Sequence, residues 1–391
     1  MARRRSEADE RVAALLRTAR SALGLSLAFL SRVDGDVQHL EIVEAAVPLL
    51  FRDGSEKPWH DSICRAILEG RLPAVMPDLT AHPEAMALPA ATWPRIRSYI
   101  SVPVVLSDGT TYGTFCAAGF GKDKALSRRD LALMEVLSQA AAVIVEPEFR
   151  RRTRHAEIEG RIDPVVAAGG PAVLLQPIVE LGTGRRIGAE ALSRFPGAWQ
   201  RPPDVCFAEA HEVGSGDELE ILALRRAAEH LRGVGGYVAM NVSPSTLLTH
   251  ECLDTLARLP LDRIVLELSE HQQVEDYDLL KGALAPLRAG GMRLAVDDVG
   301  AGFSSLRHIV LTQPDVIKLD RSIVTGVAGD AVLQVLVRSL TGLAAGTGAA
   351  VVAEGVETAE DAAVLTGLGV TYGQGWHFGH AVDPVELRER Y

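Results

Sequence analysis

The fold of the C-terminal part is decided by the stretch RLAVDDV at residues 293–299 and by the run DVIKLDR at residues 315–321. Both are short apolar runs of strand length, and helical stretches such as residues 217–232 and 331–346 separate most runs of this kind. The alternation indicates an α/β chain that ends in a (β/α)8 TIM-like barrel. A doubly wound parallel sheet is the alternative, although no G-x-G-x-x-G motif follows the first run. The eight runs are residues 172–179, 186–195, 237–243, 263–270, 293–299, 315–321, 350–356 and 370–378.

Nearly every one of these runs carries a polar residue near its C-terminal end. A charge inside an apolar strand is unfavourable unless it is paired or bound to a metal. In a barrel the C-terminal ends of the strands converge on one face, where active sites lie. We therefore expect one pocket to collect the following residues: Glu190, Asn241, Glu267, Asp297, Asp298, Lys318, Glu354 and Gln374.

The residue types in this pocket predict a divalent cation site. Six carboxylates would repel one another and stay ionised only with cations among them; they are Glu190, Glu267, Asp297, Asp298, Glu354 and Glu357. Oxygen ligands, including the Asn241 amide, favour Mg²⁺ or Mn²⁺ over zinc or copper. Two such ions held by carboxylates are a common device for cutting phosphodiesters.

Lys318 is one of five lysines in a chain with 35 arginines. A lysine inside the run VIKLD therefore suggests a need for a compact ammonium group at that place. The alternative interpretation is a buried lysine that only pairs with one of the carboxylates.

The composition excludes several classes of partner. The net charge of −11 makes the chain a poor binder of DNA or RNA polymers and of anionic membranes. No apolar run reaches the ~18–20 residues of a spanning helix, and residues 1–10 lead into no signal-peptide core. The four cysteines form no C-x-x-C pair. These features favour a cytoplasmic protein without a disulfide framework.

The N-terminal part follows a different pattern. An amphipathic helix opens it, strand-like runs follow, and residues 98–119 are typical of a hairpin that turns at Ser107-Asp108-Gly109. This order favours an α+β domain with an antiparallel sheet. A helix that begins near Ser127 is expected to continue into a charge-dense segment at residues 145–160, which indicates a domain boundary.

Residues 171–382 resemble an EAL domain, the cyclic di-GMP phosphodiesterase family. The naming tripeptide stands at Glu190-Ala191-Leu192, after Gln176-Pro177. The family motifs then continue in order as Asn241-Val242-Ser243-Pro244, Glu267-Leu268-Ser269-Glu270, DDVGAGFSSL from Asp297, Ile317-Lys318-Leu319-Asp320, Ala353-Glu354-Gly355-Val356-Glu357 and Gln374-Gly375.

The resemblance implies a role for each matching residue. Lys318 would orient the attacking water, Glu354 would be the general base, and Glu270 would anchor the loop after the Asp297–Asp298 pair. The implied metal ligands are Glu190, Asn241, Glu267, Asp297 and Asp298. The implied substrate contacts are Gln176, Leu192, Arg194, Glu357 and Gln374.

Three features need separate interpretation. Val299 and Ala301 are smaller than the residues usual in the family at these places, which puts the stability of that loop in doubt. His377 and His380 replace other residues and are not expected to be catalytic. Residues 214–218 echo the GGDEF motif of diguanylate cyclases, but they head a helix, so we reject cyclase activity.

Residues 8–146 resemble a GAF domain, a small sensory module, on the motifs Tyr99-Ile100-Ser101-Val102-Pro103 and Tyr112-Gly113-Thr114-Phe115-Cys116. Cys64 and His60 raise the question of a bilin or haem, but we interpret them as a buried small residue and a surface histidine. The predicted organisation is a GAF-like domain (8–146), a helical linker (147–165) and an EAL domain (166–391).

The sequence thus predicts sensor-regulated hydrolysis of cyclic di-GMP to linear pGpG, with two Mg²⁺ or Mn²⁺ ions per site. The alternatives are a catalytically silent cyclic di-GMP receptor and a GAF-based assembly protein with an unregulated enzyme. A homodimer is expected, and a small molecule is a possible but unidentified ligand of the GAF domain.

Overall fold

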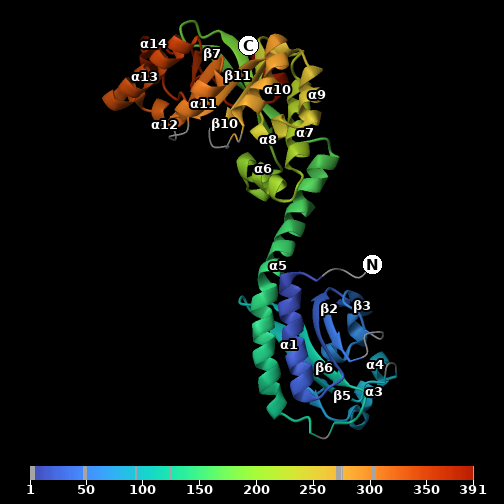
Figure 1. The fold of residues 1–391 in the computed structure, drawn as a ribbon. Helices are drawn as coiled ribbons and strands as arrows, with labels where there is room; N and C mark the ends of the chain where they lie inside the picture. The colour runs from blue at the N-terminus through green and yellow to red at the C-terminus, as the bar shows by residue number, and fades with distance from the viewer. Residues whose placement is uncertain are drawn as a thin grey trace. The chain divides into compact units, whose positions relative to one another are not determined.

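The computed structural model describes residues 5–46, 51–92, 95–123, 125–269, 274, 276–300 and 305–390. The chain forms two compact units, Met1–Arg154 and His155–Tyr391 (Figure 1).

The N-terminal unit contains an antiparallel sheet. Within the described residues its strand order is β3-β2-β1-β6-β5-β4, and neighbouring strands pair in antiparallel directions. The predicted hairpin is confirmed as β5 and β6. The strands are β1 (Leu27–Asp34), β2 (Val37–Ala45), β3 (Ser55–Pro58), β4 (Val75–Met76), β5 (Ser98–Val105) and β6 (Thr111–Gly119).

Two apolar layers cover the two faces of this sheet. In β1, Ala28 and Leu30 face the cluster that includes α1 and α5, whereas Leu27 and Phe29 face the cluster that includes α2. Figure 1 shows α1 and α5 side by side along the first face. The helices are α1 (Glu7–Leu23), α2 (Ile63–Leu68), α3 (Pro83–Ala87), α4 (Pro89–Thr92) and α5 (Arg129–Ala167).

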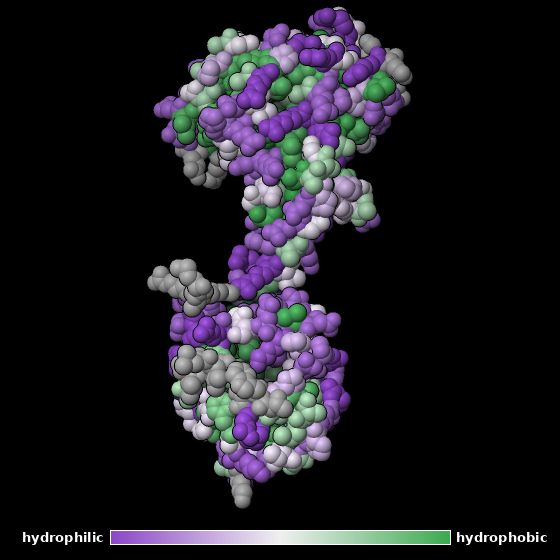
Figure 2. Space-filling view, turned by 90° about the vertical axis from the view of Figure 1, so that its right-hand side faces the viewer, coloured by the Kyte–Doolittle hydropathy of each residue, from purple (hydrophilic) through white to green (hydrophobic). Residues whose placement is uncertain are grey.

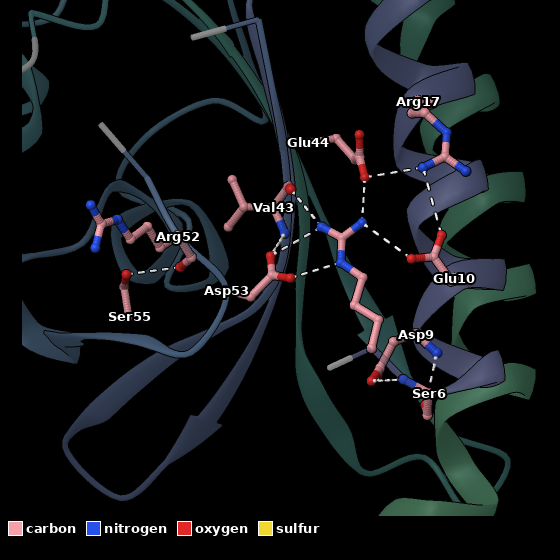
Figure 3. A network of polar contacts seen from close by, with 10 residues as sticks. Ser6, Asp9, Glu10, Arg17, Val43, Glu44, Arg52, Asp53 and Ser55 are labelled. Carbon is pink, nitrogen blue, oxygen red and sulfur yellow. Dashed lines mark hydrogen bonds and ion pairs between the residues drawn. The ribbon is translucent and has the colours of Figure 1, made fainter. Parts of the chain in front are cut away.

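A polar cluster fixes the beginning of α1 against the sheet (Figure 3). Arg5 donates to Glu44 and Asp53 at 2.7 Å each and to the Val43 carbonyl at 3.0 Å. Ser6 and Asp9 form a reciprocal capping box at the first turn of the helix. The chain entering α1 is therefore tied to β2 and to the segment after it.

The C-terminal unit is a closed barrel with the strand order β10-β11-β12-β13-β14-β7-β8-β9 in the part of the chain that is described. This confirms the predicted α/β barrel. The strands are β7 (Ala172–Glu180), β8 (Arg186–Arg194), β9 (Tyr237–Asn241), β10 (Ile264–Ser269), β11 (Arg293–Val299), β12 (Val316–Leu319), β13 (Ala350–Ala353) and β14 (Tyr372–Gly373).

One strand departs from a regular (β/α)8 barrel. β7 runs antiparallel to both of its neighbours, β8 and β14. Only residues 181–185 separate β7 from β8, whereas a crossover to a parallel strand needs a dozen residues or more. The expectation that all C-terminal strand ends meet on one face therefore fails for β7.

Helices surround the barrel (Figure 1). They are α6 (Pro203–Glu212), α7 (Gly216–Ala228), α8 (Pro244–Leu247), α9 (His250–Ala257), α10 (Tyr277–Ala289), α11 (Ser305–Thr312), α12 (Arg321–Val324), α13 (Ala331–Thr347), α14 (Ala359–Gly367) and α15 (Pro384–Arg390). The residues that echo the cyclase motif do lead into a helix, since α7 begins at Gly216.

Hydrophilic side chains predominate on the face shown in Figure 2. Among the described residues, no helix combines the length and the apolar character that crossing a membrane requires.

Candidate active site at the mouth of the barrel

The polar residues at the end of the barrel where β10 to β13 finish, which we call the mouth, lie next to an apolar layer inside the barrel. Val265, Ala295, Val316 and Val352 belong to a single buried cluster, with one residue from each of four successive strands. Side chains two positions apart on a strand point to the same side. The residues two positions further on therefore also point inward, at the end of the barrel, and they are Glu267, Asp297, Lys318 and Glu354.

Lys318 lies at the centre of these carboxylates. Its side chain is 1% exposed, and Nζ is 2.6 Å from Glu354 Oε1 and 2.9 Å from Glu267 Oε1. Nζ is also 3.1 Å from Asp297 Oδ1 and 3.7 Å from Glu190 Oε1. One ammonium group thus faces four carboxylates in a buried place, which is more negative charge than it can neutralise.

The pKa shifts reflect this imbalance. Burial, together with the neighbouring carboxylates, raises the pKa of Glu267 and of Glu354 well above the usual value, although Lys318 opposes the rise. Burial also acts on Glu190, but the charge of Lys318 and hydrogen bonds from Gln374 and Asn241 outweigh it and lower its pKa. Burial disfavours the charged form of Lys318, yet the four carboxylates raise its pKa. Lys318 alone therefore does not balance the four carboxylates, and further positive charge at the site would stabilise their ionised forms.

Two overlapping groups of carboxylates have the geometry to hold cations. Oxygen atoms of Glu190, Glu267 and Asp297 lie within 4.8 Å of one another, and so do those of Asp297, Asp298 and Glu354. Glu267 Oε2 is buried and has no hydrogen-bond partner among the described residues. An all-oxygen donor set with such an unsatisfied atom fits a hard divalent cation such as Mg²⁺ or Mn²⁺. Asp297 belongs to both groups.

Two amides hold the Glu190 carboxylate in place. Asn241 Nδ2 donates to Oε1 at 3.1 Å, and Gln374 Nε2 donates to Oε2 at 2.6 Å. Gln374 Nε2 also lies 3.0 Å from Gln176 Oε1, and Gln176 donates to the Gly379 carbonyl at 3.1 Å. Gln374 is buried, and in this structure its amide orients a predicted metal ligand. Residues from β7, β8, β9 and the segment after β14 thus meet at one carboxylate.

A pocket of about 380 Å³ opens beside the carboxylates. Leu192, Arg194, Asn241, Asp297 and Asp298 all line it, so it joins predicted metal ligands to two predicted substrate contacts.

The sequence reasoning missed the far wall of this pocket, which α6 and α7 supply. Glu220 is buried, accepts a hydrogen bond from the backbone N–H of Ser243 at 2.7 Å, and lies 2.6 Å from His211 Nε2. The hydrogen bond to Glu220 raises the pKa of His211 despite partial burial. Ser243 lies in the recognised Asn241–Pro244 motif, but nothing in the spacing pointed to Glu220.

The other residues singled out in the sequence lie outside the carboxylate cluster, at its edge, or outside the described residues. Glu357 is exposed on the segment after β13. Asp298 adopts a φ of 59° within β11, at the place where the pairing with β12 is irregular between Val296 and Val299. Val299 is buried in β11, whereas Ala301 and the predicted loop anchor Glu270 lie outside the described residues. His60 is exposed and Cys64 is buried, as expected.

Comparison with protein families assigns both parts of the chain. The EAL domain family matches residues 162–381, so the chain belongs to this family. The GAF domain family matches residues 6–146.

Individual relatives share the C-terminal part. A protein of Escherichia coli strain K12, named probable cyclic di-GMP phosphodiesterase PdeB, is 30% identical over 227 residues, covering 54% of this chain and 43% of the relative. An uncharacterised protein of Mycobacterium tuberculosis strain ATCC 25618 / H37Rv is 31% identical over 240 residues, covering 56% of this chain and 77% of the relative.

A solved structure supports the same family. The PaMucR phosphodiesterase in complex with c-di-GMP is 27% identical with a TM-score of 0.50, covering 55% of this chain and 98% of that chain. The chain spans only 34% to 36% of the length of several curated relatives that it matches.

Proposed function

We propose that this chain hydrolyses cyclic di-GMP to linear pGpG at the mouth of the barrel with two divalent cations, Mg²⁺ or Mn²⁺, bound. The observation that carries the proposal is the pair of carboxylate groups that share Asp297, beside a pocket lined by Arg194. The names of the Escherichia coli relative and of the PaMucR structure support the same substrate.

The cations would be held by residues from four adjacent strands. Glu190, Asn241, Glu267 and Asp297 would hold the first ion, and Asp297 and Asp298 would contribute to the second. Such ions, when bound, supply Lewis-acid polarisation of the phosphate and make water a nucleophile near neutral pH.

Glu354 would deprotonate the attacking water, and Lys318 would orient it. Glu354 has 19% of its side chain exposed at the mouth, so a water can reach it, and a positioned carboxylate can accept the proton of that water as a general base. Lys318 Nζ lies 2.6 Å from Glu354 Oε1, in direct contact, and would donate a hydrogen bond to a water bound beside both groups. The proton of the water would go to Glu354 as the new P–O bond forms. The bond to the leaving ribose oxygen would break, and that oxygen would take up a proton from solvent.

The pocket beside the carboxylates would hold the nucleotide. Within the part of the chain that the structure describes, Arg194 Nη1 donates to the Ser193 carbonyl at 2.9 Å, and the guanidinium has further N–H donors for a phosphate oxygen or a guanine edge. Leu192 offers an apolar surface for a base. Glu357, which is exposed, and Gln176 are proposed as further contacts.

We also propose that the GAF domain (8–146) regulates the EAL domain (166–391) through residues 147–165, and that the chain works as a homodimer. Residues 147–165 are helical within α5, which supports a connector role. Light scattering of the full chain would test the dimer, and mass spectrometry of co-purified small molecules would reveal a GAF ligand.

The decisive experiment is to incubate the full chain with cyclic di-GMP and either Mg²⁺, Mn²⁺ or EDTA and to separate the products by chromatography. The expected result is pGpG with either metal and none with EDTA. Binding of cyclic di-GMP without any product would overturn the proposal and favour the silent receptor.

A further inference from the structure

Two cysteines from distant parts of the sequence meet inside the N-terminal unit. Cys64 lies in the first turn of α2 and Cys116 in β6, yet their Sγ atoms are 3.5 Å apart. Their side chains are 2% and 0% exposed. A disulfide has an S–S length of about 2.05 Å, so a small change of the side-chain torsions would bring the sulfur atoms within bonding distance.

Polar groups surround this pair although it lies within an apolar cluster. Gln38 Nε2 donates to Cys64 Sγ at 3.2 Å, and the Tyr99 hydroxyl lies 3.0 Å from the same sulfur. Ser101 Oγ and Thr114 Oγ1 lie 3.1 and 3.2 Å from Cys116 Sγ. Two cysteines that only filled space would not need this many buried hydrogen-bonding groups, each of which loses water on folding.

A small solute has room to reach one of the two thiols. Cys64, Gln38, Lys57 and Tyr99 line a cavity of about 310 Å³ whose remaining walls are mainly apolar. Cys116 does not line the cavity and lies behind Cys64. The Cys64 sulfur is therefore accessible from the cavity, whereas the Cys116 sulfur is reached from it through Cys64.

The pKa values of the two thiols also distinguish Cys64, which lines the cavity, from Cys116, which does not. Burial raises the pKa of Cys64, but hydrogen bonds from Cys116, Thr114, Tyr99 and Gln38 outweigh it and lower the pKa to about 6. Burial and the proximity of Cys64 raise the pKa of Cys116 well above the usual value. Cys64 is thus the better nucleophile, since the thiolate is the reactive form.

We propose that Cys64 and Cys116 are an oxidisable dithiol site, at which a small hydroperoxide entering the cavity drives formation of an intramolecular disulfide. Cys64 sulfur attacks one peroxide oxygen, the O–O bond breaks, and the thiol becomes a sulfenic acid as one water leaves. Cys116 sulfur then attacks Cys64 sulfur, the S–O bond breaks, and a second water leaves with the remaining proton. Two thiols and one hydrogen peroxide thus give one disulfide and two waters.

The same chain supplies matched reference thiols. Cys206 and Cys252 are also buried and free, and burial raises the pKa of Cys206 and raises that of Cys252 to about 12. A general oxidation of the protein would affect all four cysteines, whereas a built dithiol site would react first.

The test is to treat the full chain with hydrogen peroxide for increasing times, block the remaining thiols with N-ethylmaleimide, digest with trypsin and analyse the peptides by mass spectrometry without reduction. The expected product joins peptides 53–65 and 98–122 with the loss of two hydrogens. Cys64 should react at least about tenfold faster than Cys206 and Cys252. In Cys116→Ser, Cys64 should stop at the sulfenic acid, which dimedone traps.

Three results would overturn the proposal. They are oxidation of Cys64 at the rate of the reference thiols, a wild-type reaction that stops at the Cys64 sulfenic acid, and a disulfide between two chains. The wild-type measurement does not depend on the folding of any variant.

Discussion

Replacing Lys318 by methionine would remove the single ammonium group from the carboxylate cluster while keeping a similar side-chain length. The four N–O distances of 2.6–3.7 Å correspond to a gross attraction of about 4–6 kcal/mol for each pair at an effective dielectric constant of 20. The desolvation of a buried ammonium group offsets most of this sum. Breaking a buried ion pair from one side costs about 3–5 kcal/mol, which we expect for Lys318→Met in EDTA.

Hydrogen–deuterium exchange suits this test, because two compact units need not unfold together. Amides of β10 to β13 should exchange about 10²- to 10⁴-fold faster in the variant, whereas those of β1 to β6 should not change. Saturating Mg²⁺ or Mn²⁺ should reduce the difference, since divalent cations supply the missing positive charge.

Lys281→Met is the matched control, because Lys281 is exposed on α10 of the same unit. If Lys318→Met exchanged no faster than this control in EDTA, or if metal left the difference unchanged, the reasoning about charge imbalance in the site would be refuted.

Three further changes test separate parts of the site. Glu190→Ala should lower kcat for pGpG formation by about 10³-fold, because it removes a proposed metal ligand; activity near wild type would contradict that role. Arg194→Ala should raise KM about tenfold with a smaller change in kcat, whereas an unchanged KM would exclude its proposed phosphate contact. The hydrogen bond to Glu220 raises the pKa of His211, so its stabilisation is present below the unfolded value of 6.5 and is lost as the pH rises through the folded value. Thermal unfolding of wild type and His211→Gln should therefore differ more at about pH 5.5 than at about pH 8.5, and an equal difference would argue against the shift.

Most of the barrel could be predicted because most strands show a recognisable pattern in the local sequence. A buried strand is an apolar run. The polar residue at the mouth stands two positions after the last apolar residue that points into the barrel, as Glu267 follows Val265 and Lys318 follows Val316. This period of two is a local property, so it survives in the sequence without knowledge of the neighbours. The prediction missed the antiparallel direction of β7, although the structure leaves only five residues between β7 and β8.

Contacts between distant segments could not be predicted in this way. The wall formed by His211 and Glu220 depends on how α6 packs against α7 and on how Glu220 meets Ser243, and no spacing within those helices shows it. The same holds for Cys64 and Cys116, which are 52 positions apart. Gln374 was expected to contact substrate, but only the structure shows that its amide is bonded to Glu190.

The central claim is that the carboxylates at the mouth of the barrel hydrolyse cyclic di-GMP with Glu354 as the base. The most direct test is single-turnover formation of pGpG by wild type, Glu354→Gln and Glu357→Gln at saturating Mg²⁺ or Mn²⁺. Glu357 is exposed and carries the same charge three residues away, so Glu357→Gln controls for the loss of one carboxylate. We predict that Glu354→Gln slows hydrolysis by about 10²- to 10⁴-fold while Glu357→Gln mainly weakens binding. Hydrolysis by Glu354→Gln at the wild-type rate would contradict the account.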